Sequence, residues 1–248
     1  MSGSREECVL IQAALNGGTT RATHPGVPLT PAELAAEAEA AMRAGAGAFH
    51  LHPRDAAGDQ TLEPEHVLAA VAAVRAATGL PVGVTTGIWT VQGDVRRRLA
   101  LVAGWTGDRR PDYASINMNE PGIEDLADLL TSLGIGIEAG VWTAEDARVL
   151  AATGFRDRLR WVLMEPEETD PAAAVATAAA AAAELARQGI TVRQVRHGYE
   201  MATWDVLRAS LADGQDIRIG LEDTTLLPDG STAKSNAALV AAAARLAG

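Results

Sequence analysis

Short apolar runs recur along the chain, and each is followed by a segment with helical spacing. The runs are rich in Val, Ile, Leu and Ala, as expected of strands that are buried on both faces. The predicted strands are 9–15, 48–52, 81–85, 113–117, 134–138, 161–164, 192–195 and 217–222. The pattern therefore predicts eight strands that alternate with helices.

Helix boundaries support this division. Thr30-Pro31-Ala32-Glu33 combines an N-cap threonine, a proline at the first helical position and a glutamate that completes a capping box. Thr143 and Asp170-Pro171 open two later helices in the same manner. The glycines that stand where helices should stop are Gly45, Gly79, Gly134, Gly154 and Gly189.

Repeated strand–helix–strand units require parallel strands joined by right-handed crossovers. Eight units that close on themselves form a (β/α)8 barrel, the TIM barrel fold, and 248 residues are a usual length for it. No linker or charge block divides the chain, so residues 1–248 are predicted to form one domain. A doubly wound open sheet is the alternative.

Composition narrows the function. A formal net charge of −11 and a pI near 4.9 argue against nucleic acid, which is bound by Lys/Arg surfaces. The single cysteine, Cys8, excludes an internal disulfide and is expected to fill the core. No uncharged apolar run is long enough for a membrane span and no signal peptide is recognised, so a cytoplasmic location is expected.

The active site of a TIM barrel lies at the C-terminal ends of its strands, which makes polar residues at these positions the candidates. They are Asn16, His50, His52, Thr85, Thr86, Asn117, Glu138, Glu165, His197, Glu222 and Asp223, with Arg218 lower on the last strand.

His50 and His52 are the most informative pair. Side chains alternate along a strand, so both imidazoles point to one side while Phe49 and Leu51 point to the other. With a carboxylate from another strand, two imidazoles so spaced can hold a catalytic metal such as zinc. The alternative is a pair of histidines at a surface strand end.

Glu222 is the predicted third ligand. In a strand over 217–222, Arg218, Gly220 and Glu222 share a face, and the glycine leaves room beneath Glu222. A buried ion pair with Arg218 is the alternative reading. Asp223 is then placed to act as a general base near the metal.

Other candidates are weaker. His24 and His66 lie in loop or helix-surface contexts and are expected to be solvated. Trp89 and Trp142 follow strand ends and could wall a pocket, whereas His197 suits either a pocket or a strand end.

Several segments together resemble the β-keto acid cleavage enzymes, whose type member cleaves 3-keto-5-aminohexanoate. The resemblance spans about Leu10 to Leu246. It rests on Asn16-Gly17, Val27-Pro28-Leu29-Thr30-Pro31-Ala32-Glu33, Ala44-Gly45-Ala46, Phe49-His50-Leu51-His52-Pro53-Arg54-Asp55, Thr85-Thr86-Gly87, Arg218-Ile219-Gly220-Leu221-Glu222-Asp223 and Ser235-Asn236-Ala237.

The resemblance implies a zinc TIM barrel that exchanges a β-keto acid with acetyl-CoA, giving acetoacetate and a new acyl-CoA. His50, His52 and Glu222 match the family's zinc ligands, and Asp223 and Arg218 match its base and the coupled arginine. Thr85 and Ser115 match substrate-contacting hydroxyls, and Asn16, Asn117 and Glu138 complete the predicted substrate-binding set. The family also implies a homo-oligomer, a tetramer.

The chain departs from the family at four places. Gly18 and Thr19 replace a glutamate that holds the type substrate's amino group, and Gly140 replaces one of two acids on the fifth strand. Residues 165–168 and 197–200 replace glycine-containing loops. Acidic loops oppose a polyanionic cofactor. Two alternatives therefore stay open: a metal-dependent C–C lyase or aldolase that does not use CoA, and a metal-bearing binding protein whose catalytic apparatus has drifted.

Overall fold

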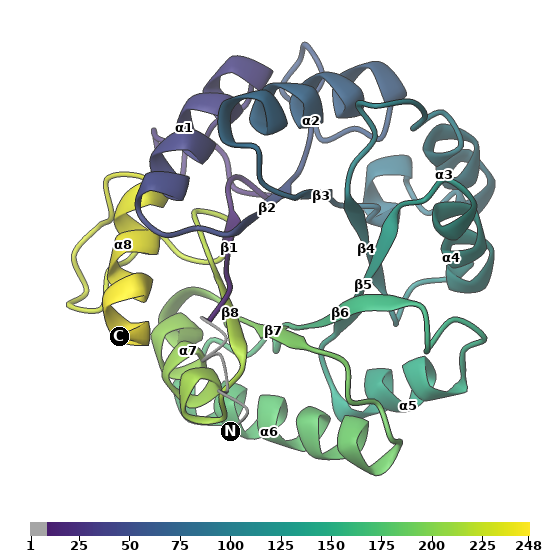
Figure 1. Ribbon diagram of the computed structural model, residues 1–248. Coiled ribbons are helices and arrows are strands. Elements are labelled where there is room, and N and C mark those ends of the chain that lie inside the picture. Colours follow the sequence, from purple (N-terminus) through teal and green to yellow (C-terminus); the bar gives the residue numbers. More distant parts are fainter. Residues whose placement is uncertain (1–8) are drawn as a thin grey trace, which may run out of the picture.

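Eight parallel strands close into a barrel in the order β1 to β8, surrounded by helices (Figure 1). The computed structural model describes residues 9–248. The strands are β1 (Ile11–Ala14), β2 (Ala48–Leu51), β3 (Val82–Val84), β4 (Tyr113–Asn117), β5 (Gly136–Val141), β6 (Leu159–Met164), β7 (Gln194–Arg196) and β8 (Asp216–Ile219). The TIM barrel prediction is confirmed.

A helix follows each strand. The helices are α1 (Pro31–Arg43), α2 (Pro64–Thr78), α3 (Val95–Val102), α4 (Ile123–Ser132), α5 (Ala144–Ala152), α6 (Pro171–Arg187), α7 (Thr203–Ala212) and α8 (Asn236–Ala247), with short 3-10 helices η1 (Ile88–Val91) and η2 (Glu200–Ala202). Among residues 9–248, none of the helices has the length and apolar character needed to cross a membrane. Cys8 lies outside the described residues.

The expected caps form. Thr30 and Thr143 make capping boxes at α1 and α5, and the Asp170 side chain accepts from the backbone N–H of Ala173 at the start of α6. Three predicted stop glycines, Gly79, Gly134 and Gly189, have φ of 68°, 69° and 72°, the left-handed region that glycine adopts without strain.

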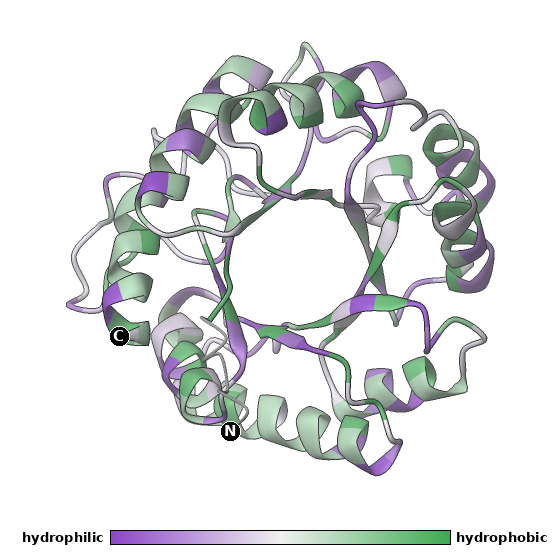
Figure 2. Cartoon of the chain, viewed as in Figure 1, coloured by the Kyte–Doolittle hydropathy of each residue, from purple (hydrophilic) through white to green (hydrophobic). Residues whose placement is uncertain are grey.

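The strands have two different faces. Outward residues such as Phe49 and Leu51 join the large apolar core beneath the helices. A smaller cluster of Ala48, Tyr113, Trp161, Leu163 and Val195 forms separately from that core. Figure 2 shows hydrophobic stretches on every side of the barrel wall, with hydrophilic positions between them.

The first and last strands close the barrel. β1 pairs with both β2 and β8, and Gln12 lies opposite Arg218 in this register. Asn236 bridges the segments that follow β8 and β1. Its Oδ1 accepts from Leu221 N at 2.8 Å, and its Nδ2 donates to Leu15 O at 3.0 Å. The strand-end residues of β1 and β8 are thereby held side by side.

Most strand boundaries differ from the prediction by one to three residues, and the differences in β5 and β8 change the position of a candidate residue. β5 begins at Gly136 and runs to Val141, because Gly134 still belongs to the turn after α4. Glu138 is therefore in the middle of the strand and not at its end. β8 stops at Ile219, so Glu222 is not part of a strand.

Candidate metal centre and active site

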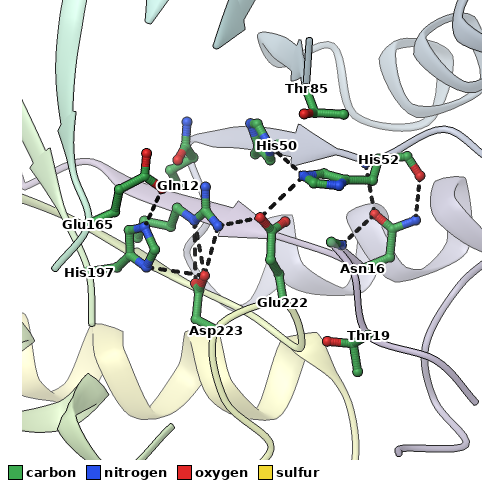
Figure 3. A network of polar contacts seen from close by, with 12 residues as sticks. Gln12, Asn16, Thr19, His50, His52, Thr85, Glu165, His197, Glu222 and Asp223 are labelled. Carbon is green, nitrogen blue, oxygen red and sulfur yellow. Dashed lines mark hydrogen bonds and ion pairs between the residues drawn. The ribbon is translucent and has the colours of Figure 1, made fainter. Parts of the chain in front are cut away.

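Three side chains converge at the C-terminal end of the barrel. His50 lies in β2 and His52 just after it, and Glu222 approaches from the turn after β8 (Figure 3). The two imidazole Nε2 atoms are 3.2 Å apart, and His52 Nε2 lies 3.3 Å from Glu222 Oε1. One ligand atom from each residue lies within 4.8 Å of the other two, so the triad can hold a metal ion.

Each imidazole has an oxygen atom facing its Nδ1, the ring nitrogen that points away from the triad. His52 Nδ1 forms a hydrogen bond of 2.6 Å with Gln60 Oε1, whereas His50 Nδ1 faces Glu138 Oε2 at 3.3 Å in an electrostatic contact without a hydrogen bond. An acceptor at Nδ1 places the ring proton there and leaves Nε2 with a free lone pair, the form that binds metals. Two such lone pairs at 3.2 Å repel each other unless a cation lies between them.

Glu222 is ionised in this setting. Burial opposes its charge, but Arg218, His52 and His50 together hold the pKa of this carboxyl well below its usual value. Arg218 donates from Nη2 to Glu222 Oε1 at 2.5 Å, whereas the buried Oε2 has no hydrogen-bond partner. A buried carboxylate oxygen without a partner is costly, and a cation would satisfy it.

A second polar chain runs behind the triad. Arg218 donates from Nη2 to Asp223 Oδ1 at 2.8 Å and holds this carboxylate opposite His197, whose Nδ1 is 3.2 Å away. His197 Nε2 in turn lies 3.3 Å from Glu165 Oε2 (Figure 3). Both His197 and Asp223 are buried, so their polar contact is shielded from water.

A cavity of about 440 Å³ opens above the triad. It is lined by three of the predicted substrate-binding residues, Thr85, Ser115 and Asn117, and by both predicted wall residues, Trp89 and Trp142. Its remaining lining consists of Gly18, Thr19, Thr23, His50, His52, Leu163, Glu165, Tyr199, Glu200, Arg218 and Glu222.

Two other predicted substrate residues lie outside that lining. Asn16 is fully buried, with its Oδ1 accepting from His52 N at 2.9 Å and its Nδ2 donating to His52 O at 2.9 Å. Glu138 lies beneath His50, where its Oε1 accepts from Gln12 at 2.6 Å and from Trp161 at 2.5 Å. These contacts favour roles in orienting the histidines.

Asp223 also lies outside the main cavity. It borders a neighbouring space of about 260 Å³ together with Glu222. Burial raises the pKa of this carboxyl above its ordinary value, although the Arg218 guanidinium opposes the rise.

Two local interpretations are wrong. Gly220 does not leave room beneath Glu222, because a Cβ there would lie 1.8 Å from Ala14 O; the glycine instead allows β8 to approach the backbone of β1. His24 is not solvated: it is buried, and its Nε2 lies 2.8 Å from Ala233 O.

Sequence reasoning missed three supporting residues. Gln12 follows the inward alternation of β1 and could have been found from it, since Ile11 and Ala13 on either side are apolar. Gln60 and Arg54 reach the site from the loop after β2, where no periodicity indicates side-chain direction; Arg54 donates to Thr19 O at 3.3 Å.

Known proteins share this architecture. The family model described as beta-keto acid cleavage enzyme matches residues 8–149 and 123–248. The 3-keto-5-aminohexanoate cleavage enzyme of Fusobacterium nucleatum is 28% identical over 259 residues, which cover 97% of this chain and 92% of that enzyme.

Solved structures agree on the fold. ObcA in a binary complex with oxaloacetate superposes with a TM-score of 0.70 at 20% identity, and the matched part covers 89% of this chain. The match spans 63% of ObcA, so that protein is considerably longer. The 3-dehydroquinate dehydratase of Aquifex aeolicus has a TM-score of 0.56 at 14% identity and covers 96% of both chains.

The two overlapping matches to the family model together extend from residue 8 to the last residue, and they include both histidines, the arginine and both acids of the site. The chain therefore belongs to the β-keto acid cleavage enzyme family.

Proposed function

We propose that this protein exchanges a β-keto acid with acetyl-CoA by a retro-Claisen route, giving acetoacetate and a new acyl-CoA. The proposed metal is zinc, held by His50, His52 and Glu222. The observation that carries the proposal is the convergence of two imidazole Nε2 atoms and one carboxylate oxygen at the floor of the cavity.

The donor set fits such an ion. Two neutral imidazoles and one carboxylate are a His₂Glu set, which catalytic zinc sites use while keeping a position open for substrate. The unpartnered Glu222 Oε2 and the facing lone pairs of the histidines are the features that a cation would resolve. When bound, the metal supplies a Lewis acid that polarises the keto oxygen of the substrate.

Asp223 is the proposed base and Arg218 its partner. The raised pKa of Asp223 makes its carboxylate a stronger base than an exposed aspartate. Arg218 contacts both Asp223 and Glu222 and also lines the cavity, so it links the base to the space that a substrate would fill.

Thr85, Ser115 and Asn117 are the proposed substrate contacts, because they line the cavity from β3 and β4. For Asn16 and Glu138 we propose a supporting role in place of direct contact. Asn16 fixes the backbone of His52, and Glu138 orients His50.

The test begins with His50→Ala. The variant should lose bound zinc, measured by elemental analysis, and turnover of a β-keto acid panel with acetyl-CoA. His66→Ala, a histidine on α2 beside Glu65, is the matched control and should keep both. A metal-free His50→Ala protein that still turns over would contradict the proposal.

A second candidate, a CoA-independent lyase or aldolase, is favoured by the charge around the cavity. The carboxyl groups of Glu200 and Glu222 line it, and Arg218, which also lines it, is already paired with two carboxylates. Cleavage of the same β-keto acids at equal rates with and without acetyl-CoA would select this candidate. Strict dependence on acetyl-CoA would exclude it.

A drifted, metal-bearing binding protein is the third candidate, and turnover of any β-keto acid excludes it. A homo-oligomer, a tetramer by family resemblance, and a cytoplasmic location remain part of the proposal. Light scattering on the purified protein and fractionation of cells would test them.

A further inference from the structure

Glu165 stands on the cavity wall without a full set of partners. It follows β6, lines the cavity and is 5% exposed. Its Oε1 is buried and has no hydrogen-bond partner. A Cβ at Gly140 would lie 2.5 Å from this oxygen, so the carboxyl group fills space that a side chain on β5 would otherwise occupy.

The position of one proton follows from the neighbours of Glu165. Glu165 Oε2 forms a hydrogen bond of 3.3 Å with His197 Nε2, whereas the opposite nitrogen, Nδ1, makes no hydrogen bond and faces Asp223 Oδ1 at 3.2 Å in an electrostatic contact. The Asp223 carboxylate is held by Arg218, so the single proton of a neutral imidazole is placed best on Nδ1, facing that charge. His197 Nε2 is then an acceptor, and Glu165 must carry a proton to complete the contact.

The surrounding charges agree with this assignment. Burial raises the pKa of Glu165 to about 7, where Arg218 on β8 and His50 on β2 oppose the rise and Glu138 and Glu222 add to it. Burial and Arg218 lower the pKa of His197 to about 4, although Asp223 and Glu222 favour the imidazolium. Of these two groups, the carboxyl and not the imidazole therefore carries the shared proton, and it does so as long as the pH stays below about 7.

We propose that Glu165 is a further catalytic residue, a neutral acid that protonates the carbon released by cleavage, and that His197 is the positioning residue that keeps it protonated. This inference rests on the proposed function. When the C–C bond breaks, its electron pair passes to the departing carbon as an enolate. That pair forms a C–H bond with the Glu165 proton. The Glu165 carboxylate then recovers a proton from solvent, to which Asp223 releases the proton that it took from the substrate, so no net proton is gained or lost.

Carboxyl titration tests the proton assignment without reference to turnover. In zinc-loaded protein labelled with ¹³C at the glutamate carboxyl carbons, one resonance should titrate near pH 7, disappear in Glu165→Gln and persist in Glu167→Gln. Glu167 is an exposed acid two residues away, so the control makes the same substitution outside the cavity that Glu165 lines. A Glu165 resonance that titrates at the ordinary value, about 4.3, would overturn the proposal.

Kinetics test the catalytic role. Glu165→Gln should lower kcat by about 10²- to 10⁴-fold, the usual contribution of a general acid, with little change in KM. The fall of wild-type kcat above pH 7 should be absent from this variant, and Glu167→Gln should match the wild type. An effect on KM alone would make Glu165 only a binding residue and overturn the proposal.

His197→Asn separates positioning from structure. An asparagine amide can donate to the Glu165 carboxylate, so both the resonance and the alkaline fall in kcat should move to lower pH; an unmoved profile would contradict the role of His197. Wild-type protein that turns over no β-keto acid contradicts the proposed function, and the catalytic role with it. The carboxyl titration still reports separately whether the proton is placed as inferred.

Discussion

Gly17 leaves the space that the side chain of Glu222 occupies. A Cβ at position 17 would lie 2.1 Å from Glu222 Cγ, and the residue has a φ of +48°. Gly17, in the turn after β1, has no side chain and thus leaves room for the proposed metal ligand that follows β8.

Gly17→Ala should therefore weaken zinc binding by about 10- to 100-fold, as the loss of a supporting contact typically does. The added methyl group displaces Glu222 and also strains the backbone. Competition titration with a chromophoric chelator measures the affinity. Gly18→Ala is the control, since its Cβ would meet only Gln60 Nε2, at an ordinary 3.8 Å, and equal losses in both variants would contradict the explanation.

Glu138→Gln should also lower zinc affinity by about 10- to 100-fold. The carboxylate lies 3.3 Å from His50 Nδ1 and fixes the ring, and an amide in its place no longer stabilises the same tautomer. The measurement is the same chelator competition, with circular dichroism as the check that the barrel is intact. Unchanged affinity would show that His50 is oriented by its packing alone.

Glu165→Gln should stabilise the protein at alkaline pH. Burial raises the pKa of Glu165 in the folded protein to about 7, above the unfolded value of about 4.3. The contribution of this group to the free energy of unfolding is therefore full below about pH 4.3 and is lost as the pH rises to about 7. The glutamine variant lacks this loss. Urea unfolding from pH 4 to pH 9 measures the difference in free energy of unfolding between the variant and the wild type. This difference should increase up to about pH 7 and stay constant above it. A difference that is constant over the whole range would contradict the raised pKa.

Glu33→Gln should destabilise α1 at neutral pH but not in strong acid. Backbone N–H groups of Thr30 and Leu29, helped by Arg21, lower the pKa of Glu33 to about 2. The stabilisation is present above the unfolded pKa and disappears as pH falls to about 2. Melting temperatures at pH 7 and pH 2 would show this pH-dependent stabilisation, with Glu39→Gln on the same helix as the control. Removal of the N-cap side chain by Thr30→Ala should lower the free energy of unfolding by about 1 kcal/mol.

The barrel could be predicted from sequence because local signals agreed with each other. Caps such as Thr30 and Thr143 and stop glycines such as Gly79 and Gly134 fixed the order of elements independently of the strands. Strand ends were less certain, since Gly134 ends one turn while the next strand begins only at Gly136. That difference moved Glu138 from the strand end to the barrel interior.

The candidate site was predictable in part. His50 and His52 are brought together by strand alternation, which the sequence displays. Glu222 was expected on the face of a continued strand, but it arrives through a turn, where Asp223 N donates to Gly220 O at 3.0 Å. Gln60 depends on the path of a loop, and no residue spacing encodes that path.

Zinc affinity should also report whether the chain has finished folding. The proposed ligands come from β2 and from the turn after β8, and Glu222 needs the glycine that follows β1. A chain whose last strand has not yet docked would hold two imidazoles but no carboxylate. Metal in solution should therefore stabilise the closed barrel, in which β8 is paired with β1, over every folding intermediate that lacks this pairing. By mass action, it should favour completion of the last folding steps.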